Sequence, residues 1–221
     1  MNSKDVIEAW KLFSAEFDFD NLSKNEYYAD MFDRFESEVL YSLIRKENIK
    51  NILEFSPNLG WTSFVMKEAL VDGYYKNKSQ AILNSFDIMC ASQTLDEHSA
   101  IVERNLRIGD VRNTISPYPK NDVDLLFIDC EHSYEFASWY CQWVIPLMEK
   151  GCIIWIHDWD KYEDDKGEPK AVKEQLIEKG ILKPIINLMD YTIENFDNDS
   201  SRKYTGPRGV RSPSQILIKV K

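Results

Sequence analysis

Short apolar segments alternate with amphipathic stretches from Lys50 to the end of the chain. The apolar segments span residues 51–55, 81–87, 105–108, 123–129, 152–157, 182–188 and 215–220. Helical periodicity is expected between them, at 61–71, 92–104, 134–149 and 168–179. Apolar runs without strict polar alternation are typical of strands that are buried on both faces. This order therefore predicts an α/β fold with a doubly wound, mostly parallel, seven-stranded sheet that resembles a Rossmann domain.

The first 49 residues have a helical pattern. Apolar residues from Tyr28 to Ile44 recur at three- and four-residue steps, which predicts a helix over about residues 25–48. We expect residues 1–49 to form a helical cap over the acceptor side of a domain at 50–221, with a homodimer contact through the same helix face as an alternative. Near the other end, residues 195–213 are rich in Asn, Ser, Gly and Pro, which predicts a long loop. Its basic residues leave two interpretations open: a lid over the active site, or a disordered loop between the last two strands.

Composition narrows the classes of function. The chain has 221 residues, with 27 Lys+Arg against 37 Asp+Glu, and 43% of the residues are hydrophobic. The apolar content excludes wholesale disorder, and the net charge of −10 argues against a nucleic-acid binder. No apolar segment approaches the roughly 18 residues of a membrane span, so we expect a cytoplasmic protein. The four cysteines form no CxxC pair and are expected to be free thiols.

Acidic residues stand at the ends of five of the predicted strands. They are Glu54, Asp87, Asp110, Asp129 and Asp158. In such a sheet ligands bind at the carboxyl ends of the strands, so these residues indicate a site. The turn after the first strand lacks the GxGxxG glycines of a dinucleotide fold, and a carboxylate there would repel a phosphate. It suits a cofactor that carries an ammonium group and hydroxyls. Asp87 is placed to accept hydrogen bonds from a ribose diol, and Asp110 from an adenine amino group.

The motifs at these strand ends resemble a known family. In chain order they are ILEFSPNLGWTS, SFD, GD, DLLFIDCEHSYE and GCIIWIHDW. They are similar to class I S-adenosylmethionine-dependent methyltransferases, in the branch with an IDxxHSYE strand and an HD pair, methyltransferase family 24. This branch contains small-molecule and sugar O-methyltransferases. The resemblance implies that the cofactor is bound by Glu54, Ser56, Asn58, Gly60, Thr62, Ser63, Asp87, Asp110 and Asp129. The family usually has glycines where Ser56 and Asn58 stand.

The ends of the fourth and fifth strands hold residues suited to the reaction. A hydroxyl is a poor nucleophile at neutral pH, so methyl transfer to it is helped by a positioned base or by a divalent cation. The resemblance implies that Asp129 and Asp158 bind Mg²⁺ and that His132 is the base, with Asp129 also part of the catalytic pair. His157 stands where the family often has a carboxylate. We expect it either to join the metal ligands and favour Mn²⁺, or to mark a site that has lost its metal.

The expected function is thus methyl transfer to a hydroxyl of a small molecule, with a sugar or glycoside as the preferred acceptor. Two alternatives stay open at this point. One is a metal-independent methyltransferase, and the other is a non-catalytic α/β domain that has lost cofactor binding, for which the missing glycines are the main support. Structural roles are the alternative for several of these residues: a hydrogen bond from His157 to a neighbouring backbone group, and core positions for Trp139, Trp143 and Trp155.

Overall fold

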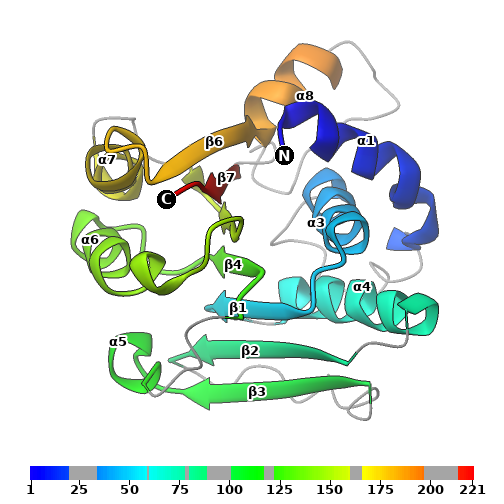
Figure 1. Cartoon of the computed structure of the whole chain (residues 1–221), viewed down its shortest axis with the longest axis horizontal. Helices are drawn as coiled ribbons and strands as arrows, with labels where there is room; N and C mark the ends of the chain where they lie inside the picture. Colours follow the sequence, from blue (N-terminus) through cyan, green and yellow to red (C-terminus); the bar gives the residue numbers. More distant parts are fainter. Residues whose placement is uncertain are drawn as a thin grey trace.

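Seven strands within the described residues form one sheet in the computed structural model (Figure 1). The structure describes residues 1–19, 34–58, 60–77, 80–88, 101–116, 122–159, 166–196 and 214–221. The spatial order of the strands is β3-β2-β1-β4-β5-β7-β6, and only β7 runs antiparallel to its neighbours. The bounds are β1 (Asn51–Phe55), β2 (Ala81–Asp87), β3 (Val102–Ile108), β4 (Leu125–Ile128), β5 (Ile153–Ile156), β6 (Leu182–Asn187) and β7 (Gln215–Lys219). The predicted doubly wound, mostly parallel sheet is confirmed.

Helices cover both faces of this sheet. Figure 1 shows α1, α3 and α4 on one side and α5, α6 and α7 on the other, with α8 beside β6. Their bounds are α1 (Ser3–Phe13), α3 (Arg34–Glu47), α4 (Trp61–Asn77), α5 (Val111–Thr114), α6 (Tyr134–Trp143), α7 (Gly167–Val172) and α8 (Leu188–Phe196). No helix among these segments is long and apolar enough to cross a membrane.

The sheet separates two clusters of buried apolar side chains. The first joins α1, α3 and α4 to the strands and includes Trp10, Val39 and Trp155. The second joins α6 and α7 to the other face and includes Phe55 and Tyr140. Since the N-terminal helices contribute to the first cluster, they share a core with the sheet. At roughly 25 cal/mol per Å² of buried apolar surface, burial in these two clusters is the main stabilising contribution of the fold.

Two predicted helices differ from the observed structure. Residues 102–104 were expected to end a helix but belong to β3, whose alternating polar side chains are typical of an edge strand; the earlier part of that predicted helix lies outside the described residues. The helix predicted at 134–149 ends as an α-helix at Trp143 and continues as a 3₁₀ turn, Ile145–Leu147. Pro146 lacks the N–H that a helix interior needs. Trp143 is 66% exposed and is therefore not a core residue.

Other predictions are confirmed for residues that the structure describes. Trp155 is fully buried, and Cys130, Cys141 and Cys152 are free thiols. Burial raises the pKa of each of these thiols, that of Cys152 to about 12. The helix predicted at 25–48 is described from Arg34 onward, and most of the loop predicted at 195–213 lies outside the described residues, as does Cys90.

Candidate active site

Glu54 lies in β1, one residue before its carboxyl end, and is fully buried. Its carboxylate accepts hydrogen bonds from the hydroxyls of Thr62 (2.8 Å), Ser63 (2.6 Å) and Ser85 (2.5 Å). Burial raises the pKa of Glu54, and the three hydroxyl donors oppose that rise. The side chains of Thr62 and Ser63, both assigned to the cofactor from the sequence, therefore contact Glu54 across the turn. They tie the first turn of α4 to the end of β1.

The turn between β1 and α4 has left-handed backbone at three alternate positions. The φ angles are 64° at Ser56, 49° at Asn58 and 91° at Gly60. Left-handed backbone is the conformation for which glycine is the usual residue, and asparagine is the side chain that tolerates it best. Ser56 and Asn58 thus take the backbone shape expected of the glycines they replace. The N–H of Asn58 donates to Oδ2 of Asp87 at 2.8 Å, which fixes the β2 carboxylate against the turn.

Asp110 follows β3 and caps the short helix α5. Its two oxygens accept hydrogen bonds from the guanidinium of Arg112, at 2.6 Å for the shortest contact, and from the Arg112 backbone N–H. These hydrogen bonds lower the pKa of Asp110. An adenine amino group at Asp110 would have to share these oxygens with Arg112. We refer to the carboxyl ends of β1, β2 and β3 as the cofactor end of the site.

The carboxyl ends of β4 and β5, here named the reacting end, lie beside the same turn. The N–H of Asp129 donates to the carbonyl of Phe55 at 3.2 Å, so Asp129 follows β4 at the point where β1 ends. Nδ1 of His157 lies 3.1 Å from Oδ1 of Asp129, and its Nε2 lies 3.5 Å from Oε2 of Glu36. Both ring nitrogens of His157 thus face carboxylates.

Two carboxylates face the buried ring of His157 and favour its cationic form. Burial alone would lower the pKa of His157, but the carboxylates of Asp129 and Glu36 outweigh it and raise the pKa well above its ordinary value. These contacts make His157 a bridge between the sheet and α3.

His132 lies three residues beyond Asp129, just before α6, and its side chain is 8% exposed. Nδ1 of its ring lies 2.9 Å from Oε2 of Glu168. Its Nε2 lies 3.6 Å from Oδ2 of Asp158 and 3.9 Å from Oδ1 of Asp129. Asp158 has left-handed backbone, with φ of 53°, in the tight turn that follows β5.

Asp129, His132 and Asp158 bring ligand atoms within 4.8 Å of one another. Carboxylate oxygens are the ligands that Mg²⁺ prefers, and imidazole is tolerated better by Mn²⁺. The residues present therefore fit a divalent cation, with Asp129 and Asp158 as the oxygen ligands and the His132 ring beside them. The chain positions of the three residues, at the ends of β4 and β5, are those expected from the sequence.

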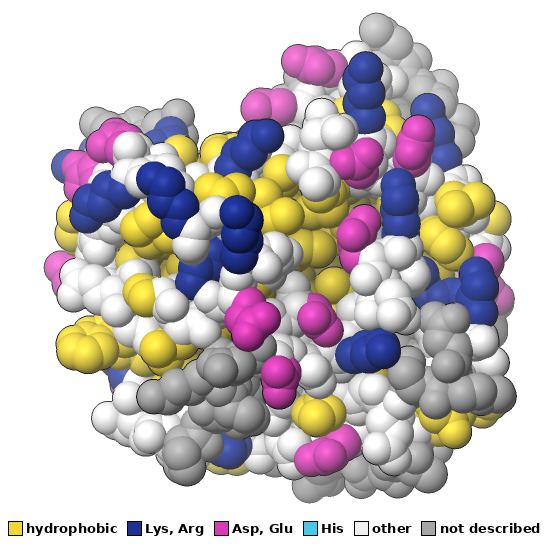
Figure 2. Space-filling view, in the orientation of Figure 1, with side chains coloured by type: hydrophobic (Ala, Val, Ile, Leu, Met, Phe, Trp, Pro, Cys, Tyr) yellow, Lys and Arg dark blue, Asp and Glu magenta, His cyan; other side chains and the backbone are white. Residues whose placement is uncertain are grey.

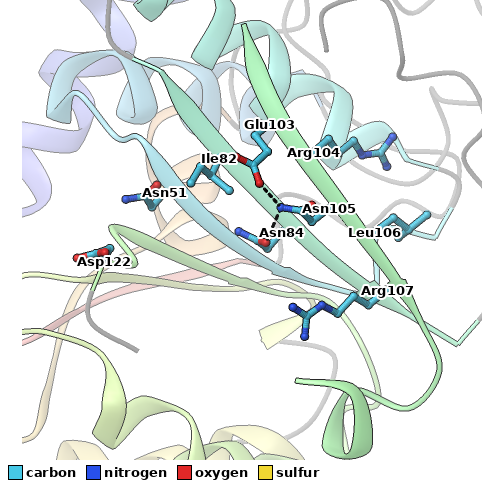
Figure 3. Close-up of a pocket in the computed structure, with 9 residues that line it drawn as sticks. All are labelled: Asn51, Ile82, Asn84, Glu103, Arg104, Asn105, Leu106, Arg107 and Asp122. Atoms are coloured by element: carbon cyan, nitrogen blue, oxygen red, sulfur yellow. Dashed lines mark hydrogen bonds between the residues drawn. The ribbon is translucent and has the colours of Figure 1, made fainter. Parts of the chain in front are cut away.

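A separate hollow of about 610 Å³ lies on the sheet face beside β3 (Figure 3). It is lined by side chains of mixed charge, and the side-chain amide of Asn105 donates to Asn84 and to Glu103 there. It includes Asn51, the first residue of β1, so it extends toward the opposite end of the strands from the candidate site.

Among the side chains described on the face drawn in Figure 2, none is a histidine, consistent with the burial of His132 and His157.

Sequence reasoning missed two residues of the reacting end. Glu36 in α3 and Glu168 in α7 are each 1% exposed, and each places a carboxylate against a histidine ring. Neither follows a strand, so the strand-end rule could not find them. The sequence held only a weak indication of their role, because each is an acidic residue in a segment whose pattern predicts a buried helix.

Comparisons with known proteins identify the family of the chain. The sequence model of a family described as a methyltransferase domain, methyltransferase family 24, matches residues 39–159, more than half of the chain. The chain belongs to this family. The match contains the strand-end residues of β1, β2, β3, β4 and β5. A search of curated protein sequences found no match.

Solved structures share the fold of this methyltransferase at low sequence identity. The O-methyltransferase TomG from Streptomyces achromogenes, solved with S-adenosylmethionine, has a TM-score of 0.58 at 15% identity, over 100% of this chain and 92% of that one. A putative caffeoyl-CoA O-methyltransferase from Staphylococcus aureus has a TM-score of 0.61 at 15% identity, over 97% and 99%. CalS11, a TDP-rhamnose 3′-O-methyltransferase, has a TM-score of 0.51 at 15% identity, over 81% and 88%. The fold is that of a class I methyltransferase.

Proposed function

We propose that this methyltransferase transfers a methyl group from S-adenosylmethionine to a hydroxyl of a small molecule, with a sugar or glycoside as the preferred acceptor. The observation that carries the proposal is the position of the His132 ring. Its Nε2 faces Asp129 and Asp158 directly beside the turn after β1. A base next to a cofactor turn is the arrangement that methyl transfer to a hydroxyl requires. The sugar preference has its support in the motif resemblance and in the fold that CalS11 shares.

The cofactor end supplies the binding groups in this proposal. The left-handed backbone of Ser56, Asn58 and Gly60 opens the turn, and Asp87 is held against it by the Asn58 N–H. We assign the ribose hydroxyls to Asp87 and the methionine amino group to the region of Glu54. When bound, S-adenosylmethionine supplies a sulfonium methyl group that is open to attack by a nucleophile.

The reacting end prepares the acceptor. His132 takes the proton from the acceptor hydroxyl at Nε2, so that the oxygen becomes nucleophilic as it approaches the methyl group. Asp129 and Asp158 would hold a divalent cation whose charge lowers the pKa of the bound hydroxyl. His157 keeps Asp129 oriented through the contact between Nδ1 and Oδ1.

Two substitutions separate binding from chemistry. His132→Ala is expected to lower kcat by about 10²- to 10⁴-fold, because a positioned base contributes that much, while the Kd for S-adenosylmethionine stays within about twofold. Asp87→Asn is expected to weaken cofactor binding by roughly 10-fold, because one charged hydrogen-bond acceptor is lost. Calorimetry measures the Kd, and mass spectrometry of a panel of nucleotide sugars, glycosides and phenols measures the methylated product. Undiminished turnover in His132→Ala would contradict the base assignment.

Removal of metal ions tests the two alternatives. If Asp129 and Asp158 hold a cation that activates the acceptor, dialysis against EDTA should abolish turnover and added Mg²⁺ or Mn²⁺ should restore it. Turnover that is unchanged by EDTA would favour the metal-independent methyltransferase. An absence of heat with both S-adenosylmethionine and its demethylated product would favour the non-catalytic domain.

A further inference from the structure

Glu168, in the first turn of α7, is joined to His132 by two hydrogen bonds. Its backbone N–H donates to the carbonyl of His132 at 3.1 Å, and its Oε2 lies 2.9 Å from Nδ1 of the ring. The other carboxylate oxygen, Oε1, accepts a hydrogen bond from the hydroxyl of Tyr140 at 2.8 Å. Glu168 is 1% exposed, so water does not compete for either oxygen. The backbone and the side chain of Glu168 thus both fix the position of His132.

We propose that Glu168 is a positioning residue that holds His132 in the tautomer with hydrogen on Nδ1, so that the unshared pair on Nε2 faces Asp129 and Asp158. The inference rests on the proposed function, in which Nε2 of His132 takes the proton of the acceptor. It adds the residue that decides which ring nitrogen is able to do so.

The hydrogen-bond inventory of the three side chains leads to this tautomer. An ionised carboxylate can only accept hydrogen bonds, and the Tyr140 hydroxyl already donates to Oε1. Burial raises the pKa of Glu168, and the hydrogen bonds from His132 and Tyr140 oppose that rise by favouring the ionised form. With Glu168 ionised, the contact of Oε2 with His132 requires Nδ1–H as the donor. In a neutral imidazole the other nitrogen then carries the unshared pair. That nitrogen is Nε2, which lies 3.6 Å from Asp158 and 3.9 Å from Asp129.

A purely structural role would give Glu168 the same contacts. It ties together α6, through Tyr140, the segment before α6, through His132, and α7. The substitution Glu168→Gln separates the two roles. The amide oxygen of Gln can still accept from Tyr140, but its NH₂ group can only donate to Nδ1. The ring would then carry its hydrogen on Nε2 and present a donor to the site.

The tautomer can be read directly in the full-length protein. The chain has three histidines, so ¹⁵N–¹H correlation spectra of the labelled protein hold three ring systems, and the His132→Ala variant identifies that of His132. At a pH where the His132 ring is neutral, the wild type is expected to show Nδ1–H and Glu168→Gln is expected to show Nε2–H. Turnover of Glu168→Gln should fall by about 10²- to 10⁴-fold in kcat with KM for the acceptor nearly unchanged, as for a base in the wrong tautomer.

Glu38→Gln is the matched control. Glu38 is also a buried carboxylate, and it accepts hydrogen bonds from the Trp10 indole at 2.8 Å and from Arg34 at 2.7 Å. It is expected to lose stability by an amount similar to Glu168→Gln, while the His132 tautomer and kcat stay as in the wild type. A structural role for Glu168 predicts instead that the two variants behave alike in all three measurements.

The wild-type spectrum tests the inference even if the Glu168→Gln variant does not fold. An Nε2–H signal from His132 in the wild type overturns it, whether or not the protein transfers methyl groups. An Nε2–H signal with normal turnover in Glu168→Gln also overturns the positioning role. If the wild type shows Nδ1–H and His132→Ala keeps full turnover, the tautomer assignment stands and the base role in the proposed function fails.

Discussion

The cofactor end and the reacting end hold their buried carboxylates in different ways. At the cofactor end, Glu54 is surrounded by three neutral hydroxyl donors, from Thr62, Ser63 and Ser85. At the reacting end, carboxylates face imidazole rings: Asp129 contacts His157, and Glu168 contacts His132. Hydroxyls satisfy a carboxylate without altering the charge of the site. Imidazoles make charge and orientation depend on protons, which is what an acid–base site needs.

The two ends also differ in charge balance. The described part of the reacting end has four carboxylates, Glu36, Asp129, Asp158 and Glu168, around His132 and His157. Even with both rings protonated, the four negative charges exceed the two positive ones. Among these six side chains, negative charge therefore gathers around the two histidines. At the cofactor end, the carboxylate of Glu54 instead accepts hydrogen bonds from three neutral hydroxyls.

The largest effect on stability is expected from His157→Ala. Removal of the ring leaves Glu36 and Asp129 without their shared cationic partner, and the loss of one member of a buried ion pair costs roughly 3–5 kcal/mol. Urea denaturation measures the free energy of unfolding. The double variant Glu36→Gln with His157→Ala should regain part of the loss, because it removes the stranded carboxylate. If the double variant is no more stable than His157→Ala, the bridge between α3 and the sheet is not an ion pair.

Glu54→Ala tests the cofactor end in the same way and is expected to cost less. It leaves three buried hydroxyls without their common acceptor, but these can rotate to other partners, so we expect a loss of about 2–3 kcal/mol. The exposed Glu103→Ala is the matched control and should change the free energy of unfolding by less than about 0.5 kcal/mol. If Glu54→Ala lowers the free energy of unfolding as much as His157→Ala does, hydroxyl and imidazole partners stabilise a buried carboxylate equally.

The strand ends were predictable because they obey a local rule. β1 and β2 were predicted with their observed bounds, and Asp129, His132 and Asp158 were predicted to meet. A parallel sheet brings the carboxyl ends of its strands to one edge, so strand order along the chain is enough to place them. The same rule accounts for Glu54 and Asp87 lying at one turn.

The partners of those residues were not predictable in this way. Glu36 and Glu168 come from helices, and their contacts depend on how α3 and α7 pack against the sheet. A single sequence shows which face of a helix is apolar, but not which acidic residue on it ends beside a histidine. His157 was predicted as a metal ligand or as the mark of a lost metal, and its contact with Glu36 adds a partner from α3 that the sequence did not reveal. β3 was shortened in the prediction because Glu103 and Arg104 resemble a helix surface as much as an edge strand.

Glu54 and His157 should contribute to stability over different pH ranges. The pKa of Glu54 is raised from 4.5 in the folded protein, so the folded state binds its proton more tightly, and stability falls as the pH rises above about 4.5. The pKa of His157 is raised from 6.5, so its contribution is complete below about pH 6.5 and is lost as the pH rises through the folded value.

Urea denaturation of the wild type and of two variants over a range of pH separates these contributions. Glu54→Gln should flatten the acidic part of the profile in part, because the amide does not titrate while Glu168, whose pKa is also raised by burial, still does. His157→Gln should flatten the part above about pH 6.5 and leave the acidic part unchanged. A variant that flattens the range assigned to the other end would contradict the comparison.

The smallest effect is expected in the turn that joins the two ends. Ser56 has φ of 64°, which a side chain with a Cβ adopts only with strain, so Ser56→Gly should raise the free energy of unfolding by about 0.5–1 kcal/mol. Asn58→Gly should gain less, because asparagine tolerates the same backbone better. Ser42→Gly in the middle of α3 is the matched control and should instead lose about 0.5 kcal/mol. Equal losses at Ser56 and Ser42 in urea denaturation would mean that the turn does not need glycine-like backbone.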